Sequence, residues 1–373
     1  MFDDFFKKAP KPKSEPDYTL ITLIAILTIF GLVMLASASS DIAKMKFGNS
    51  YFYITHQLIY GLSIGLIGFF VGSTVYYQRW KKVSVLLLVL NIIALILVFT
   101  PIGVSAQGAT RWLNIGGVSF QPGEALKISF LIYLSAWISK RKKRSKSFTK
   151  GLLPFSILTG GVVFLLLAQP STGTAAIIFG TSLVVYFISG AKAKFVTSLI
   201  LIALVAFAGL VYTSPYRMER IKTFLNPTKE KLESSYHINQ ALTAIGSGGI
   251  TGVGYGQSTT KINYLPEPIG DSIFAVIAEE LGFAGSFALI LMFGILVWRG
   301  IKIARKVPDS FGKLLTVGFA TLIGFQAFVN IGAISGLIPL TGVPLPFISY
   351  GGTALAVFLT MSGIMVNVSR YRK

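Results

Sequence analysis

The sequence predicts an all-α integral membrane protein with about ten transmembrane helices, and three features of its composition support this fold class. Of the 373 residues, 53% are hydrophobic and only 13% are charged, whereas a soluble domain carries roughly a quarter charged residues. The apolar residues form long continuous runs that suit spanning helices and exceed the length of barrel strands. The charged residues gather in short clusters between these runs. Lipid is therefore expected to solvate much of the surface.

Ten apolar runs come close to the ~20 residues that a spanning helix needs. They cover residues 18–39, 51–74, 83–101, 121–139, 151–169, 173–190, 195–213, 271–298, 314–336 and 349–368. The sixth run is short and the eighth is long, so their ends are the least well defined. Residues 18–369 are predicted to form one membrane domain between two cytoplasmic tails, residues 1–17 and 370–373. The first span is expected to be retained and not cleaved as a signal peptide.

The basic residues predict which side each loop faces, because cytoplasmic loops of membrane proteins carry an excess of Lys and Arg. Most of them lie in the N-terminal tail, in the loops after the second, fourth, sixth and eighth runs, and in the C-terminal RYRK. Both termini are therefore predicted to be cytoplasmic, which requires an even number of spans. Residues 214–270, between the seventh and eighth runs, become a large extracytoplasmic loop, and loops of this length usually carry function.

The composition also excludes several classes of function. The net charge of +20 does not indicate nucleic-acid binding, because the basic residues are placed as membrane anchors. The chain has no Cys and only two His, His56 and His237, which excludes disulfides and leaves little material for a metal centre. No metal-ligand spacing is evident, although a divalent cation such as Mg²⁺ or Mn²⁺ stays compatible with the sequence.

Ionisable residues within apolar runs are rare and indicate function by default. Glu124 and Lys127 begin the fourth run, and their i, i+3 spacing places them on one helix face, where they are expected to pair. The pair either makes two charges tolerable in the bundle or lines a polar substrate groove; we favour the groove, because two apolar residues would be less costly. Glu279 and Glu280 in the eighth run cannot share a face, so at least one is expected to face the interior, in a packing or a site role.

Asp271 stands where the helix-breaking segment YLPEPIG meets the eighth run. One interpretation is a helix N-cap, whose carboxylate accepts hydrogen bonds from backbone N–H groups. The other is a carboxylate held at the outer membrane surface and available as a general base. The residues alone leave both interpretations open.

Two further outer segments place polar residues in unusual surroundings. SGLIPLTGVPLPFISYGG (335–352) is rich in Pro and Gly and is predicted to be non-helical, either lining a groove with Ser349 and Tyr350 or forming a re-entrant connector. Arg111, and Arg217, Arg220 and Lys222 of YRMERIKTFLNP, are cations on the side that disfavours them. They indicate an anionic partner such as a phosphate or a lipid headgroup, or else salt bridges to loop acids such as Glu219.

Five motifs, taken together and in order, are recognisable. They are GATRWLNIGGVSFQPGEALK, YRMERIKTFLNP, HINQALTAIGSGGITGVGYGQS, YLPEPIGDSIFAVIAEELG and GLIPLTGVPLPFISYGGT. This series resembles the SEDS family (shape, elongation, division and sporulation) over nearly the whole chain beyond the N-terminal tail. The LPEP and AIGSGG–GYGQS stretches are more similar to the division members (FtsW) than to the elongation members (RodA).

The resemblance implies a ten-helix fold in the bacterial cytoplasmic membrane and polymerisation of lipid II, the undecaprenyl-pyrophosphate-linked disaccharide-pentapeptide, into glycan strands. It carries the family's essential acid onto Asp271 and its intramembrane polar pair onto Glu124 and Lys127. It also implies a class B penicillin-binding protein, which is a transpeptidase, and other divisome proteins as partners.

The chain departs from the family pattern in two places. The usual His-Thr before the essential Asp is Ile269-Gly270 here, and Ser272 follows that Asp. The usual Gln-Pro-Asp-Leu-Gly-Thr reads QPSTGT at residues 169–174. Loss of that Asp puts any role of the motif's carboxylate in doubt.

These observations lead to the hypothesis of an inverting glycosyl transfer at the outer membrane surface. Asp271 would accept the proton of the acceptor GlcNAc 4-hydroxyl as its oxygen attacks the anomeric carbon of the donor MurNAc. Arg111, Arg217 and Lys127, with or without a divalent cation, would neutralise the pyrophosphate leaving group. A lipid II flippase or other transporter and a non-catalytic divisome scaffold are the competing hypotheses, since intramembrane charges also suit transporters.

Overall fold

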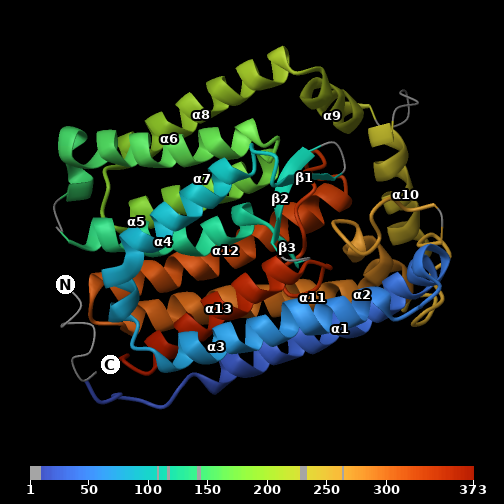
Figure 1. Ribbon diagram of the computed structural model, residues 1–373, viewed down its shortest axis with the longest axis horizontal. Helices are drawn as coiled ribbons and strands as arrows, with labels where there is room; N and C mark the ends of the chain where they lie inside the picture. The colour runs from blue at the N-terminus through green and yellow to red at the C-terminus, as the bar shows by residue number, and fades with distance from the viewer. Residues whose placement is uncertain (1–9, 107–108, 116–117, 141–143, 227–232, 263) are drawn as a thin grey trace.

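The computed structural model describes residues 10–106, 109–115, 118–140, 144–226, 233–262 and 264–373. Long helices, packed side by side, make up nearly all of the molecule (Figure 1). They are α1 (Tyr18–Phe47), α2 (Phe52–His56), α3 (Ile64–Thr74), α4 (Gln78–Leu97), α5 (Pro122–Ser139), α6 (Leu153–Ala168), α7 (Thr172–Ile188), α8 (Ala193–Thr213), α9 (Pro215–Leu225), α10 (Glu233–Ser247), α11 (Ile273–Lys306), α12 (Ser310–Ile334) and α13 (Gly352–Ser369). The short π-helix η1 (Gln57–Ser63) joins α2 to α3, and a second one, η3 (Phe148–Leu152), leads into α6. Between α5 and η3 lies a 3-10 turn, η2 (Arg144–Lys146).

Each of the ten predicted spans is helical, which confirms the membrane fold class. Within the described residues, eight helical stretches are long and apolar enough to cross a membrane. They are 18–47, 52–74, 78–97, 148–168, 193–213, 273–306, 310–334 and 352–369. The two remaining predicted spans correspond to α5 and to α7, which is apolar but shorter. The total of ten membrane crossings stays a prediction.

The two ends of the chain lie together, as an even number of crossings requires. The N–H of Lys13 donates to the Arg370 carbonyl oxygen at 2.9 Å, and the buried Asp17 carboxylate pairs with Arg299 (2.8 Å) and with Arg372. The C-terminus lies at the left of Figure 1, whereas α9 and α10 lie at the opposite end. Of the basic residues predicted to be cytoplasmic, Lys7, Lys8 and those at 141–143 lie outside the described residues.

The outer segments contain structure that the all-α prediction missed. Three short strands form an antiparallel sheet in the order β1 (Gly103–Ala106), β2 (Ala109–Ile115) and β3 (Val118–Phe120). In its register Val104 faces Trp112 and Leu113 faces Phe120. The strands escaped prediction because this segment is short, rich in Gly and without clear alternation. The sheet holds Arg111 in β2 and leads directly into Glu124 and Lys127 of α5.

The core of the molecule is formed by α12 and α13, with α5 beside them. In α12 and α13, 72% of the most apolar stretch is buried, against 11% in α8. Outward faces of α3, α4, α6 and α8 are covered with exposed Leu, Ile, Val and Phe, as expected for surfaces that face lipid chains. The best buried helices therefore carry the polar residues of the interior, and the exposed ones form the lipid-facing shell.

Helix α11 is interrupted at Gly282, which has a left-handed backbone (φ +64°). The broken helical hydrogen bonds are replaced by the loop after α10. The N–H groups of Val253 and Gly254 donate to the carbonyl oxygens of residues 279 and 280, and those of residues 283 and 284 donate to the carbonyl oxygens of residues 249 and 250. Backbone groups within a membrane must find such partners. The loop therefore completes α11 and places its outer segment, which begins next to Asp271.

Candidate active site at the outer end of the bundle

Asp271 lies just before α11 and does not cap it. The helix begins at Ile273, its N-cap residue is Ser272, and that residue makes no side-chain capping bond. The N-cap interpretation of Asp271 is therefore wrong, because Ser272 takes that position and the helix begins one residue later than the interpretation requires. The carboxylate instead interacts with the backbone N–H groups of Asp271 and Ser272, at the turn that leads into α11.

The backbone around Asp271 is held by other elements. The Asn330 side chain of α12 donates from Nδ2 to the Asp271 carbonyl oxygen at 2.7 Å. Ser349 Oγ donates to the carbonyl oxygen of residue 270 at 2.6 Å, and the N–H of Tyr350 donates to that of residue 269 at 2.8 Å. Three consecutive carbonyl groups are therefore fixed by α12 and by the segment 335–351.

The Asp271 carboxyl group is placed in surroundings that favour its protonated form. The residue is partly exposed, while its Oδ1 is buried without a hydrogen-bond partner among the described residues. Desolvation raises the pKa of Asp271 to about 6, against the opposing effect of the nearby Arg220 guanidinium. Oδ2 lies beside Gly342, where an added Cβ would come to 3.7 Å from it. A carboxyl group with a pKa near neutrality is suited to proton transfer at physiological pH.

Three arginines approach this end of the bundle. Arg111 donates to the carbonyl oxygens of residues 169 (3.2 Å) and 170 (2.5 Å), and Arg217 contacts the Thr172 hydroxyl at 3.4 Å. Both predicted arginines therefore contact the 169–174 turn that departs from the family pattern. Desolvation lowers the pKa of Arg111, and the Arg220 charge lowers it further.

Arg220 is the cation whose charge acts on Asp271. The sequence places it among the outer cations that indicate an anionic partner, but it was not among the residues assigned to the site. It donates to the Leu340 carbonyl oxygen at 2.7 Å and stacks 4.6 Å from the ring centre of Tyr216. With apolar side chains of α9, α10 and the 336–340 segment it lines a small cavity. The i, i+3 spacing of Arg217 and Arg220 in α9 was the available signal, since it turns both toward the same side.

His237 of α10 also reaches the start of α11. Its Nε2 lies 2.6 Å from the hydroxyl of Ser272, the residue after Asp271. Burial lowers the pKa of His237 to about 4, with a further lowering by Arg220, so the ring is neutral at physiological pH. Here α10 supplies an imidazole to the residue after Asp271, whereas the family pattern has a His-Thr before that Asp. Because residues 237 and 272 are far apart in the sequence, no local pattern predicts this contact.

Glu124 and Lys127 form the predicted pair, fully buried, with Lys127 Nζ 2.5 Å from Glu124 Oε1. Lys127 Nζ also donates to Gln326 Oε1 of α12 at 2.7 Å, and it lies 5.6 Å from the centre of the Phe358 ring. Glu124 Oε2 is buried without a partner among the described residues. The pair is thus connected to α12, and its predicted place in a substrate groove stays a prediction.

Ser349 and Tyr350 lie in the non-helical segment before α13, as expected from its Pro and Gly residues. The Ser349 hydroxyl is buried and also accepts the N–H of Leu345 at 2.8 Å. The Tyr350 ring is half-buried and packs edge-on against Tyr53, with 5.1 Å between ring centres. Both residues shape the segment that holds residues 269 and 270, and contact with a substrate stays a prediction for each.

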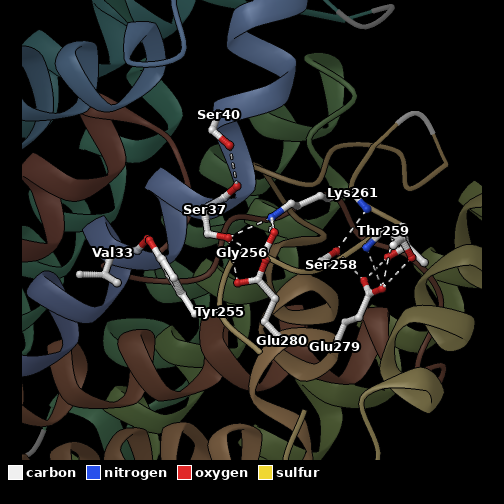
Figure 2. Close-up of polar contacts among 11 residues, drawn as sticks. Val33, Ser37, Ser40, Tyr255, Gly256, Ser258, Thr259, Lys261, Glu279 and Glu280 are labelled. Carbon is white, nitrogen blue, oxygen red and sulfur yellow. Dashed lines mark hydrogen bonds and ion pairs between the residues drawn. The ribbon is translucent and has the colours of Figure 1, made fainter. Parts of the chain in front are cut away.

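Glu279 and Glu280 are both buried, each with its own set of partners, as Figure 2 shows. The Glu279 carboxylate accepts hydrogen bonds from Ser258, Thr259 and Thr260. Glu280 pairs with Lys261 at 2.8 Å and accepts the hydroxyl of Ser37 from α1. The expectation that at least one glutamate faces the interior is confirmed. These contacts fasten the loop of residues 256–261 to α11 beside its break.

A metal centre made only of protein ligands is not formed by the described part of the chain. No group of three or more His, Asp or Glu side chains that could hold a metal ion occurs there. The groups around Asp271 and its neighbour Ser272 are the Arg220 guanidinium, the Asn330 amide and the neutral imidazole of His237. This set suits an anionic ligand better than a metal ion.

Comparison with known proteins places this arrangement in one family. Residues 18–373 match the FtsW/RodA/SpoVE family of cell cycle proteins. Stage V sporulation protein E of Bacillus subtilis is 40% identical over 362 residues, covering 97% of this chain and 99% of that protein. A probable peptidoglycan glycosyltransferase FtsW of Geobacter sp. (strain M18) is 40% identical over 354 residues, covering 95% and 96%.

Solved structures also match this chain over nearly its whole length. A chain from a peptidoglycan synthase complex, solved for its coordination of polymerisation and crosslinking, superposes with a TM-score of 0.80 at 29% identity, covering 96% of this chain and 99% of that chain. The rod shape determining protein RodA of Thermus thermophilus superposes with a TM-score of 0.70 at 28% identity, covering 96% and 97%. The chain therefore belongs to the FtsW/RodA/SpoVE family of membrane proteins, as its five motifs predicted.

Proposed function

We propose that the chain is a peptidoglycan glycosyltransferase of the bacterial cytoplasmic membrane, which polymerises lipid II at the outer membrane surface with Asp271 as general base. The family and the names of relatives that match nearly the whole chain support the activity. The observation that supports the site is a carboxyl group of raised pKa on a partly exposed residue, within reach of the Arg220 charge and beside Ser272, which His237 of α10 contacts.

The reaction forms one glycosidic bond and breaks one bond to phosphate. The 4-hydroxyl oxygen of the acceptor GlcNAc attacks the anomeric carbon of the donor MurNAc from the face opposite the pyrophosphate. The bond from that carbon to the phosphate oxygen breaks, and undecaprenyl pyrophosphate leaves with the electron pair, which inverts the anomeric configuration. Asp271 takes the hydroxyl proton, a contribution worth about 10²–10⁴-fold in rate.

The leaving pyrophosphate needs charge neutralisation more than a proton. Arg220 is the cation whose charge reaches Asp271, and Arg111 and Arg217 lie on the neighbouring 169–174 turn. Guanidinium groups bind phosphate oxygens in pairs, and a cation placed where charge develops is worth several kcal/mol. Lys127 is engaged by Glu124 and Gln326, so we assign it to holding the interior and not to the phosphate.

A transpeptidase of the class B penicillin-binding type is the proposed partner. The structural relative belongs to a complex that coordinates polymerisation with crosslinking, and crosslinking is transpeptidase chemistry. The relatives named FtsW and SpoVE favour a role in division or sporulation over elongation.

The decisive experiment supplies fluorescent lipid II to the purified chain in detergent, with and without a partner transpeptidase, and separates the products by size. Elongated glycan strands without any membrane gradient are expected. Movement of lipid II across a bilayer without polymer would support the flippase hypothesis. The scaffold hypothesis would be supported if polymer forms only when the partner is present, and forms equally well with a catalytically inactive variant of the chain.

A further inference from the structure

Helix α12 carries two buried amide side chains one turn apart, Gln326 and Asn330 (0% and 1% exposed). Their i, i+4 spacing places both on one face of the helix. Gln326 Nε2 donates to the carbonyl oxygen of Pro344 at 2.8 Å. Asn330 Nδ2 donates to the carbonyl oxygens of Val343 and Asp271, at 2.8 and 2.7 Å. Both amides therefore contact the non-helical segment 335–351, and Asn330 alone also contacts the Asp271 backbone.

These hydrogen bonds join three separate parts of the chain. Gln326 Oε1 accepts the Lys127 ammonium of α5, so the buried Glu124–Lys127 pair connects through α12 to Pro344. Asn330 then spans the gap between residue 343 and residue 271 with the two hydrogens of one NH₂ group. Gly342, next to Val343, lies beside Asp271 Oδ2. Ser349 and the N–H of Tyr350 hold residues 270 and 269 to the same segment, and Asn330 is the side chain that joins Asp271 itself to residue 343.

We propose that Asn330 is a positioning residue, which holds the Asp271 main chain against the 341–343 segment so that the carboxylate keeps the geometry needed for proton transfer. This inference rests on the proposed role of Asp271 and adds the group that aims it. Small errors in the placement of a reacting group lower rates steeply, by about 10²-fold for 1 Å.

Two observations separate this role from ordinary packing. Asn330 Oδ1 is buried without a hydrogen-bond partner among the described residues. The amide is therefore oriented so that its NH₂ group makes two hydrogen bonds while its oxygen makes none. A buried amide is costly unless fully hydrogen-bonded, and an apolar residue would pack α12 without that loss. The only carbonyl groups that the donor serves are those of Asp271 and of the segment facing it.

The test compares Asn330→Ala with a matched variant, Asn367→Ala, in the purified polymerase. Asn367 of α13 is also 1% exposed and also makes two side-chain bonds to backbone, to Ser73 and Tyr77, at the cytoplasmic end. Both variants should lower the unfolding temperature to a similar extent. Asn330→Ala should lower kcat by about 10–100-fold with KM for lipid II within about twofold, whereas Asn367→Ala should keep kcat.

Asn330→Asp keeps the size of the side chain but cannot donate to two carbonyl oxygens. We expect it to lose as much kcat as the alanine variant. Wild-type kcat in Asn330→Asp, or equal kcat in Asn330→Ala and Asn367→Ala, would overturn the proposal.

Hydrogen–deuterium exchange measures local opening of the backbone, so its result does not depend on polymerase activity. Asn330→Ala should speed exchange in the peptide 264–272 and in the peptide 337–345, and Asn367→Ala should leave both unchanged. Unchanged exchange in Asn330→Ala would also overturn the proposal. If Asp271→Ala retains polymerase activity, the proposed function of Asp271 fails, and the exchange result still decides whether Asn330 holds this segment.

Discussion

The carboxyl groups of Asp17 and Asp271 illustrate how surroundings set the chemistry of one residue type. Burial acts against the charge of Asp17, but hydrogen bonds from Arg299 and Arg372 outweigh it, and the pKa of Asp17 is lowered. Desolvation is the larger effect on Asp271, where Oδ1 has no hydrogen-bond partner among the described residues, and its pKa is raised. Asp17 is therefore a structural anion, and Asp271 is able to exchange a proton near neutral pH.

This pKa predicts the pH dependence of polymerisation. The ratio kcat/KM should rise about tenfold per pH unit below pH 6 and level off above it, because the base acts only when ionised and its pKa is about 6. His237, with a pKa of about 4, is neutral across this range. His237→Gln should therefore leave the limb near pH 6 in place. A flat profile between pH 5 and 8, or loss of the limb in His237→Gln, would contradict the assignment.

The raised pKa of Asp271 also predicts how the stability of the folded protein depends on pH. The dependence is opposite to that of an Asp whose pKa is lowered by folding. Because folding raises the pKa of Asp271 from 3.8 to about 6, its contribution is present at low pH and is lost as the pH rises through about 6. Asp271→Asn should therefore be more stable than the wild type above pH 6, by about 2 kcal/mol at most given the partial exposure, and the gain should shrink toward pH 4. Thermal unfolding in detergent at both pH values measures it; a larger gain at pH 4 would exclude the raised pKa.

Arg220 should matter more than its neighbours in α9. Arg220→Ala removes the charge that opposes the raised pKa of Asp271, so the acid limb of kcat/KM should move to higher pH. It also removes a candidate phosphate ligand, and kcat should fall by about 10²-fold. Lys222→Ala, on the exposed part of the same helix, serves as the control and should keep both values. Equal effects in the two variants would reduce Arg220 to a general contribution to surface charge.

At the residue scale the sequence predicts local contacts and misses distant ones. The Glu124–Lys127 pair follows from helical spacing alone, and the structure confirms it. Arg220, His237 and Asn330 reach Asp271 or its neighbour from 35 to 59 residues away in the chain, and no local pattern encodes such contacts. Asp271 drew attention as an acid at a Pro- and Gly-rich helix entrance, but the residues alone left its role open, and the family resemblance implied that it is the essential acid.

Among the elements, α11 is the one whose geometry depends most on a single glycine. An added Cβ at Gly282 would lie 2.4 Å from the Gly252 nitrogen and 2.6 Å from the Ile250 oxygen, in a left-handed backbone. Gly282→Ala should therefore destabilise the protein by about 2–4 kcal/mol. Gly294→Ala, in the same helix with no atom within 4 Å of the added Cβ, should be neutral or stabilising by about 0.5–1 kcal/mol. Thermal unfolding of the two variants distinguishes them, and equal stabilities would argue against the interruption of α11.

The Lys261–Glu280 pair beside this interruption should behave as a unit (Figure 2). Removing one partner leaves a buried charge unpaired, so Lys261→Met or Glu280→Gln should each cost about 3–5 kcal/mol of unfolding free energy. The double variant Lys261→Met/Glu280→Gln should cost clearly less than the sum of the single changes. Lys44→Met, at an exposed position of α1, is the control. Additive losses would show that the two charges do not depend on each other.

At the element scale the long apolar runs could be predicted, because twenty apolar residues have few other uses. The interruption of α11 could not, since Gly282 lies in an apolar run and the helix is completed there by residues 249–254, which lie 28 to 33 residues earlier in the chain. The sheet of residues 103–120 and helices α9 and α10 were also missed. Their hydrophobic patterns are short, and they form against the ends of the bundle.

For the whole molecule, orientation was the most secure prediction from the sequence. The bias of basic residues placed both termini on one side, and the Asp17 contacts with Arg299 and Arg372 bring the two ends together. The helices α9 and α10 lie at the other end (Figure 1), and the candidate site is there, where Arg220 of α9, His237 of α10 and the 335–351 segment reach residues 270–272. A chain arranged in this way can receive a lipid-linked sugar from the outer leaflet without moving it across the bilayer.

Glycan polymerisation by purified Asp271→Asn protein is the most direct test of this account. The matched control is Asp41→Asn, the same substitution at an acidic residue of α1. We expect Asp271→Asn to bind lipid II and remain folded while its polymerisation rate falls by at least about 10²-fold, and Asp41→Asn to polymerise like the wild type. Glycan strands made at the wild-type rate by the Asp271→Asn protein would contradict the account.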